Sequence, residues 1–290
     1  MMSYYSAAKI NLYLGVHEKM ESGYHEITSV MQSVSLFDRL DFDFEQRDFQ
    51  LDTGDKNLGE KSQNTVTRSW ELMKEKFDLP QEVHVKLVKN IPMDAGLAGG
   101  SGDGAAMLHG VNDYFKLGLS LEELGEIGAE IGADVPFCVM GGTALACGKG
   151  DKLEKLPDFP NCQIPLVNSG ILVSTKEAFA AYDELPDKNH VGDEKAMVEA
   201  IKQNDLPKIA AALYNDLESV VLAKYPSLQK QKEDWCHRGL YPLMSGSGAS
   251  IFALCVDNSW KKLMEEWKNE NGRLFFVRPV THGVTRYEKK

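Results

Sequence analysis

A glycine-rich run over residues 92–106 is the part of this sequence best suited to chemistry. It reads Pro-Met-Asp-Ala-Gly-Leu-Ala-Gly-Gly-Ser-Gly-Asp-Gly-Ala-Ala and leads into an apolar segment with helical spacing. Glycine permits backbone conformations in which successive N–H groups point inward together, and a following helix adds the partial positive charge of its N-terminus. The run therefore predicts a cradle for an anion. It is neither a Walker A loop nor a dinucleotide fingerprint, and the alternative, a flexible surface loop, would rarely lie between a strand and an apolar helix.

Lys9 and Asn11 lie on one face of a predicted strand. Over residues 9–16, apolar residues alternate with Lys9, Asn11 and Tyr13. This period of two predicts a half-buried strand whose apolar residues face the core. Lys9 and Asn11 then project side by side from the opposite face, although a lone lysine in that place is ordinarily a solvated residue.

Three further features are ambiguous when each is taken by itself. Asp134, in the segment Gly-Ala-Asp-Val-Pro-Phe, could be a helix cap or a turn residue as well as a functional carboxylate. Tyr24 and His25 follow Gly23 in a predicted loop, where a histidine is usually exposed to solvent. The Ser-Gly-Ser-Gly turn over 245–248 fits a tight hairpin equally well.

The rest of the pattern predicts the elements that must position these residues. Strands are predicted over 40–44, 83–87, 141–147, 250–256 and 274–280. Helices are predicted over 65–77 and 107–115, after capping boxes at Ser120–Glu123 and Ser174–Glu177, and over 194–203, 207–222, 227–237 and 258–269. Because strands and helices are mixed without strict βαβ alternation, the sequence indicates the α+β class.

Composition limits the kinds of protein that this chain can be. Its 290 residues are 43% apolar and 26% charged, as in ordinary globular proteins. The net charge of −11 argues against a nucleic-acid partner but allows a small anionic substrate in a locally positive pocket. Five scattered cysteines show no metal-ligand spacing and indicate reduced thiols. With neither a signal peptide nor an apolar membrane span in sight, we expect a cytoplasmic protein without a membrane partner.

Prolines 157, 160 and 165 mark the expected boundary between two domains. The first domain, residues 1–155, would contain the glycine-rich run. The second, residues 156–290, reads as mainly helical with a few strands. The sequence does not fix whether the chain is a monomer or a homodimer.

Six segments, taken in order, resemble the motifs of the GHMP kinases. They are Ala8-Lys-Ile-Asn-Leu12, Gly23-Tyr-His25, Pro92 to Ala106, Gly132-Ala-Asp-Val-Pro136, Asn215-Asp-Leu-Glu218 and Met244-Ser-Gly-Ser-Gly-Ala249. The glycine-rich and Ser-Gly-Ser-Gly motifs are shared across that superfamily. The other motifs near the N-terminus and around residue 134 resemble the branch that phosphorylates a cytidine diphosphate-linked methylerythritol in non-mevalonate isoprenoid biosynthesis. The resemblance covers nearly the whole chain.

The resemblance implies a two-domain kinase with its active site between the domains. The first domain would be similar to ribosomal protein S5 and the second to ferredoxin. Asp134 would act as the base toward a substrate hydroxyl, and Lys9 would hold that hydroxyl and counter the developing charge. ATP, with Mg²⁺, would bind on the glycine-rich run, to which we assign Pro92, Met93, Asp94, Ala95, Gly96, Leu97, Ala98, Gly99, Gly100, Ser101 and Gly102.

The resemblance also implies which residues meet the small-molecule substrate. Tyr24 and His25 would hold the cytosine, and Asn11 would help to position the reacting hydroxyl. The rest of the substrate is assigned to Lys149, Thr175 and Tyr182. No metal site formed by protein ligands is expected.

One departure from the superfamily's pattern lies in the glycine-rich run. The loop usually reads Gly-Gly-Ser-Ser-Asp-Ala-Ala, whereas this chain has Gly102 in place of a serine and Gly104 in place of an alanine. Judged from the sequence, Gly102 removes one hydroxyl donor to phosphate. Gly104 costs roughly 0.5–1 kcal/mol of helix stability relative to alanine.

Three other functions compete with this prediction. One is a GHMP kinase for another small alcohol such as homoserine or mevalonate, against which the Gly-Tyr-His loop argues, because such a substrate has no base to stack. Another is a nucleotide-binding relative without turnover, which the presence of both Lys9 and Asp134 disfavours. The last is an RNA-binding protein with an S5-like domain, which the net charge of −11 disfavours.

Overall fold

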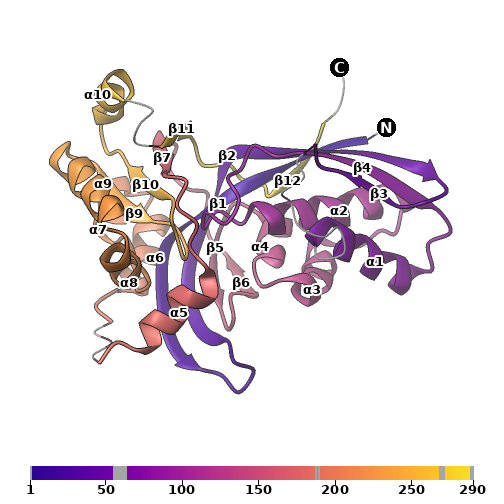
Figure 1. The fold of residues 1–290 in the computed structure, drawn as a ribbon, viewed down its shortest axis with the longest axis horizontal. Coiled ribbons are helices and arrows are strands. Elements are labelled where there is room, and N and C mark those ends of the chain that lie inside the picture. The colour runs from indigo at the N-terminus through magenta and orange to yellow at the C-terminus, as the bar shows by residue number, and fades with distance from the viewer. Residues whose placement is uncertain (1, 55–63, 187, 189, 268–271, 288–290) are drawn as a thin grey trace.

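The structure, a computed structural model, describes residues 2–54, 64–186, 188, 190–267 and 272–287. Two β-sheets with helices packed against them make up this part of the chain (Figure 1). The larger sheet has the central order β12-β1-β2-β4-β3, with β5 and β8 joining β2 and β1, and β6 joining β5. Its strands are Met2–Lys19 (β1), His25–Gln46 (β2), Gln50–Asp52 (β3), Glu82–Val88 (β4), Thr143–Cys147 (β5), Lys152–Lys155 (β6), Tyr214–Asn215 (β8) and Val284–Tyr287 (β12).

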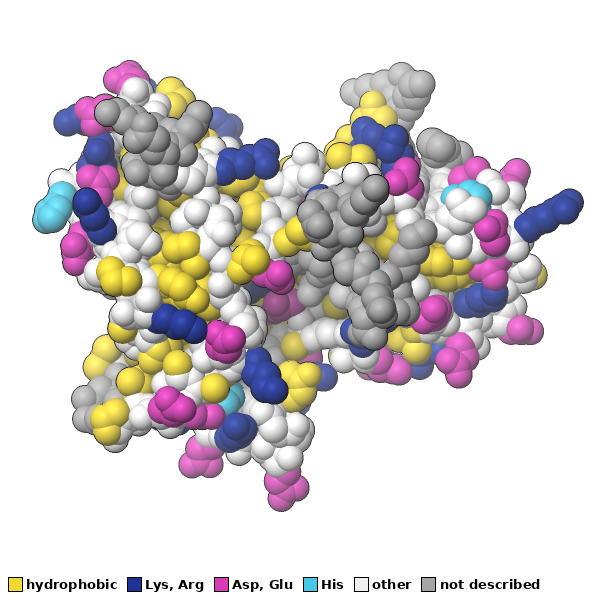
Figure 2. All heavy atoms as spheres, in the orientation of Figure 1, with side chains coloured by type: hydrophobic (Ala, Val, Ile, Leu, Met, Phe, Trp, Pro, Cys, Tyr) yellow, Lys and Arg dark blue, Asp and Glu magenta, His cyan; other side chains and the backbone are white. Residues whose placement is uncertain are grey.

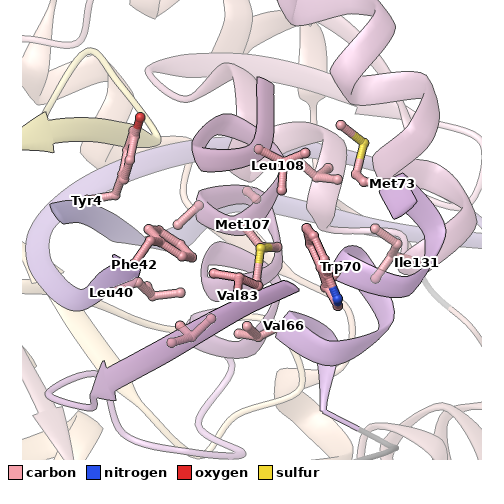
Figure 3. Packing of buried hydrophobic residues seen from close by; sticks show 14 of the residues in the cluster. Tyr4, Leu40, Phe42, Val66, Trp70, Met73, Val83, Met107, Leu108 and Ile131 are labelled. Atoms are coloured by element: carbon pink, nitrogen blue, oxygen red, sulfur yellow. The ribbon is translucent and has the colours of Figure 1, made fainter. Parts of the chain in front are cut away.

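Helices α1 to α4 cover one face of the larger sheet (Figure 1). They span Thr65–Phe77 (α1), Gly99–Phe115 (α2), Leu121–Ile131 (α3) and Val135–Met140 (α4). α1 begins where the Asn64 side chain accepts a hydrogen bond from Val66 N, and α3 begins at the predicted capping box of Ser120 and Glu123. The core between helices and sheet is formed by side chains such as Phe42, Trp70 and Met107 (Figure 3).

The smaller sheet has the order β11-β7-β10-β9. Its strands are Ile164–Asn168 (β7), Tyr241–Met244 (β9), Ile251–Leu254 (β10) and Arg273–Val277 (β11). Buried side chains of β1 such as Ile10 and Leu12 belong to the same core cluster as Leu166 and Phe252 of this sheet, so β1 joins the two halves of the molecule. The accompanying helices are Thr175–Asp183 (α5), Glu194–Lys202 (α6), Leu206–Ala211 (α7), Glu218–Lys224 (α8), Pro226–His237 (α9) and Ser259–Glu266 (α10).

The helix predicted over 207–222 is wrong. The chain instead forms α7, then the short strand Tyr214–Asn215, then α8. Tyr214 and Asn215 pair in parallel with Tyr13 and Leu14 of β1, and the side chain of Asn215 bonds to backbone groups. These tertiary hydrogen bonds override the local helical period. The end of the helix predicted at 258–269 lies outside the described residues.

The prediction of a half-buried strand over residues 9–16 is also wrong, because β1 is buried on both faces. Lys9 is 5% exposed, Asn11 3% and Tyr13 0%. The face that carries these residues is covered by segments distant in the sequence, so alternation alone does not reveal its burial. β1 is also flanked on its other edge by β12, which returns from the end of the chain, a segment assigned above to the second domain.

On the face of the molecule in Figure 2, acidic and basic side chains are interspersed rather than segregated. Within the described part of the chain, no helix has the length and apolar character that crossing a membrane requires.

Candidate active site

Lys9, Asn11 and Asp134 come together beside the glycine-rich run. Lys9 Nζ donates to Asn11 Oδ1 at 2.5 Å and lies 3.9 Å from Asp134 Oδ2. Asn11 is fixed in turn, because its Nδ2 donates to Ser29 Oγ at 2.8 Å. Lys9 and Asn11 are buried, whereas the Asp134 side chain is 41% exposed. The centre thus combines a fixed cation with a carboxylate open to solvent.

Asp134 is not used as a helix cap. It occupies the N-cap position of α4 but has φ −83° and ψ −12°, and its side chain accepts no capping hydrogen bond. Capping aspartates have an extended backbone that brings the carboxylate back to the N–H groups of the first turn. The carboxylate is therefore directed toward Lys9 instead, which leaves it available to a substrate.

Only residues 92–98 of the glycine-rich run form a loop; the predicted helix start at 107 is wrong, because α2 begins at Gly99 and includes residues 99–106 of the run. Gly96 and Ala98 are both left-handed, with φ of 73° and 54°. Ala98 is the N-cap, and α2 has neither a side-chain cap nor an acidic residue in its first turn. The first N–H groups of a helix have no partner within it, so here they are left for an external anion. This end of the helix fits a nucleotide phosphate, and the Ser101 hydroxyl in the first turn could serve a phosphate or its Mg²⁺.

The Ser-Gly-Ser-Gly turn, Ser245–Gly248, closes against this loop. Ser245 Oγ donates to the Gly96 carbonyl at 2.8 Å and accepts from Asn11 N at 3.3 Å. A Cβ at Gly96 would lie 2.0 Å from the Ser245 carbonyl oxygen, so this close approach requires glycine. The turn is therefore a wall of the site and not merely a tight hairpin.

A buried ionic network of Asp38, Lys89 and Asp103, which the sequence analysis missed, holds the backbone just before the glycine-rich run. Asp38 Oδ1 accepts from the backbone N–H groups of Asn90 and Ile91 at 2.6 and 2.9 Å. Lys89 Nζ bonds to both Asp38 and Asp103. Burial would lower the pKa of Lys89, but Asp103 and Asp38 raise it, while burial raises the pKa of Asp103 to about 7. Sequence patterns carry little sign of this network, because its members are separated along the chain: Asp38 and Lys89 by 51 positions, and Lys89 and Asp103 by 14.

His25 lies at the opposite end of α5 from this centre. It is 7% exposed, its ring stacks on Phe179 with centroids 5.0 Å apart, and its Nε2 lies 2.8 Å from Asp183 Oδ1. Burial tends to raise the pKa of Asp183, but hydrogen bonds from His25 and Lys188 lower it to about 2. Tyr24, in contrast, is 59% exposed at the turn before β2. Phe179 and Asp183 were not singled out from the sequence; their spacing of four residues on one helix is the only signal that could have found them.

The three other residues assigned to the substrate lie in different surroundings. Thr175 Oγ1 is 2.9 Å from Ser247 Oγ, which places it against the Ser245–Gly248 turn. Lys149 Nζ donates to the Ala129 carbonyl at 3.3 Å and lies 3.5 Å from Asp151, at the edge of α3. Tyr182 is buried, and its burial together with Asp216 raises its pKa to about 12. Its role as a substrate contact stays a prediction.

Gly102 differs from the rest of the run. Its N–H already donates to the Ala98 carbonyl at 2.9 Å, and a Cβ at this position would lie 3.3 Å from Ser6 Cβ of β1. The residue therefore occupies a packing position between helix and sheet. Its assignment to ATP stays a prediction.

The fold and the site define a class of protein. The domain family described as "GHMP kinases N terminal domain" matches residues 64–142, which include the glycine-rich run and Asp134. A solved homoserine kinase from Cytophaga hutchinsonii has a TM-score of 0.80 over 99% of this chain and 97% of its own, with 18% identity, and so shares the fold. The predicted α+β class and GHMP kinase fold are confirmed.

Sequence relatives place the chain within one branch of this class. It is 42% identical over 280 residues to the 4-diphosphocytidyl-2-C-methyl-D-erythritol kinase of Listeria monocytogenes, covering 95% of this chain and 94% of that one. The enzyme of the same name from Exiguobacterium sibiricum is 43% identical over 250 residues, 85% and 86% of the two chains. A crystal structure of a 4-(cytidine 5'-diphospho)-2C-methyl-D-erythritol kinase matches with a TM-score of 0.79 and 27% identity over 96% of this chain and 99% of that one. The chain belongs to the family of 4-diphosphocytidyl-2-C-methyl-D-erythritol kinases.

Proposed function

We propose that this protein transfers the γ-phosphoryl group of ATP to a hydroxyl of 4-diphosphocytidyl-2-C-methyl-D-erythritol, a step of non-mevalonate isoprenoid biosynthesis. The observation that carries the proposal is the Lys9–Asp134 pair, 3.9 Å apart, beside an uncapped helix N-terminus. Phosphoryl transfer requires positioning and charge neutralisation more than covalent chemistry, and this arrangement supplies both.

The residues divide the reaction between them. Asp134 accepts the proton of the substrate hydroxyl as that oxygen attacks the γ-phosphorus, and the bond from this phosphorus to the β–γ bridging oxygen breaks, so ADP leaves. Lys9, held by Asn11, donates to the reacting oxygen and offsets the charge that develops. The N–H groups at the start of α2 hold the phosphates. Mg²⁺ bound with the nucleotide would neutralise phosphate charge, and the Ser101 hydroxyl is the side chain of the first turn suited to it.

Helix α5 supports the choice of a long substrate. Its first residue, Thr175, contacts Ser247 of the Ser245–Gly248 turn, while Phe179 in its middle and Asp183 at its end contact His25. Nine residues of α-helix span about 12 Å. A substrate with a cytosine ring at one end and a reacting hydroxyl at the other can contact both ends of this helix. Homoserine or mevalonate would contact only the catalytic end.

An ADP-release assay with three alcohols tests the proposal. We expect turnover with the cytidyl substrate and little with mevalonate or homoserine at equal concentration. The variant Asp134→Asn, assayed beside the wild type, measures the background from contaminating ATPase. Comparable turnover with mevalonate or homoserine would contradict the assignment of the cytidyl substrate. Absence of Asp134-dependent ADP release with all three alcohols would refute a kinase function.

A further inference from the structure

The segment Asn215-Asp-Leu-Glu218 has no part in the reaction described above, yet it holds one wall of the active site. Asn215 is 6% exposed, and its Nδ2 donates to the carbonyls of Met244 and Gly246, each at 2.8 Å. Its Oδ1 accepts from Leu217 N at 2.9 Å. Glu218 Oε1 accepts from Met244 N at 2.9 Å. Both protons and the oxygen of the Asn215 amide are thus engaged: one bond holds Gly246 inside the turn at 245–248, and a second holds Met244, the residue that leads into it.

This turn contacts each of the functional parts of the site. Ser245 Oγ bonds to the Gly96 carbonyl of the phosphate-binding loop, and Ser247 Oγ bonds to Thr175. A Cβ at Gly246 would lie 3.2 Å from Asn11 Oδ1 and 3.4 Å from Lys9 Nζ. Even one added carbon at position 246 would therefore be in tight contact with Asn11 and Lys9, and a shift of the turn would move it against Lys9, Asn11 and the loop together.

We propose that Asn215 is a positioning residue for phosphoryl transfer: it holds the Ser245–Gly248 turn and, through Ser245, the relation between the phosphate-binding loop and Lys9. The proposal rests on the kinase function proposed above. It assigns a role to a motif that shares no contact with the reacting atoms and acts only through the turn.

The chemistry of the side chain explains why an asparagine stands here. A single amide nitrogen has two protons and can donate to both carbonyls, while the oxygen accepts from Leu217 N. Aspartate would place a carboxylate oxygen against two carbonyl oxygens, and alanine would leave both carbonyls without this donor. Displacement of catalytic groups by about 1 Å can reduce a rate on the order of 100-fold.

The test compares Asn215→Ala with Asn215→Ser, which keeps one donor, and with Ser219→Ala as a matched control. Ser219 Oγ donates to the Asp216 carbonyl in the same segment and does not touch the turn, so its loss should lower the melting temperature and leave kcat unchanged. At a temperature well below melting, we expect Asn215→Ala to lower kcat by about 10- to 100-fold and Asn215→Ser by less. Because both residues act through one turn, the double variant with Ser245→Ala should lose less than the product of the two single losses.

Three results would overturn the proposal. A folded Asn215→Ala with kcat within twofold of the wild type would make the motif purely structural. If the double variant lost kcat by the full product of the losses in Asn215→Ala and Ser245→Ala, Asn215 would not act through the turn. Absence of phosphoryl transfer by the wild-type protein would refute the proposed function itself. The two failures are distinguishable, because the proposed function is tested by the wild-type kcat and the role of Asn215 by the ratio of variant to wild-type kcat.

Discussion

Asp134→Asn separates a catalytic carboxylate from a structural one. The substitution keeps the shape of the side chain and removes its charge and its basicity. Because a positioned base is worth roughly 10²–10⁴ in rate, we expect kcat to fall by that factor, or about 2.7–5.5 kcal/mol in activation free energy. The effect on folding should be much smaller. The side chain is 41% exposed, forms no cap and pairs with Lys9 only at 3.9 Å, an arrangement worth about 1 kcal/mol or less.

The experiment measures both kcat and folding stability, and it includes a helix-capping aspartate as a control. Asp193 caps α6, accepting from Ala196 N at 3.0 Å, so Asp193→Asn should reduce stability slightly and leave kcat unchanged. For Asp134→Asn, ADP release should show the loss of kcat, calorimetry should show ATP affinity nearly unchanged, and the melting temperature should move by no more than a few degrees. More than half of the wild-type kcat in this variant would refute Asp134 as the base.

Three other predictions concern the glycine-rich loop and the proposed cytosine site at Tyr24 and His25. Gly96→Ala should weaken ATP binding at least tenfold, because its Cβ would meet a carbonyl oxygen at 2.0 Å; Gly118→Ala, which has the same left-handed backbone in open space, is the matched control in calorimetry. Tyr24→Ala should raise KM for the cytidyl substrate about 10- to 100-fold with little change in melting temperature, and His25→Ala should also narrow the preference for cytosine over uracil analogues; an unchanged KM in both would contradict the base site. The pKa of Asp183, lowered to about 2, means that its stabilising contribution is present above pH 4 and is lost as pH falls to 2, so Asp183→Asn should flatten this part of the stability profile in urea denaturation.

Local signals in the sequence predicted the elements that position the site. Helix α1 was predicted over 65–77 and is found over Thr65–Phe77, because its apolar spacing and its boundaries are both local. The capping boxes at Ser120 and Ser174 mark the starts of α3 and α5, with the reciprocal bond present at Ser120. The helix predicted after the glycine-rich run is present as α2, although it begins at Gly99, inside the run, and not at 107. Each of these features depends on residues within about one turn of each other.

Long-range contacts could not be predicted in this way. The partner of His25, Asp183, lies 158 positions along the chain, and the hydrogen bond from Asn11 N to Ser245 Oγ spans 234. The burial of Lys9 follows from such contacts, since the covering turn comes from the far end of the sequence. The break in the predicted helix over 207–222 has the same origin, because Tyr214 and Asn215 pair with β1. A period of two or of 3.6 carries no information about these partners.

The two unusual glycines of the glycine-rich run, Gly102 and Gly104, take on a different meaning once α2 is placed. From the sequence, Gly102 is a lost hydroxyl donor and Gly104 a weakened helix. In the structure, a Cβ at 102 would lie 3.3 Å from Ser6 Cβ, and one at 104 would lie 3.0 Å from Ser69 Oγ on α1. Both glycines therefore let α2 approach β1 and α1 closely. Since the same stretch of β1 continues to Lys9, whose N–H bonds to the Leu97 carbonyl at 3.0 Å, this packing sets how near the helix N-terminus comes to Lys9. Glycine at these positions costs roughly 0.5–1 kcal/mol of helix stability each relative to alanine. In return it permits the close packing of α2 that larger residues would hinder.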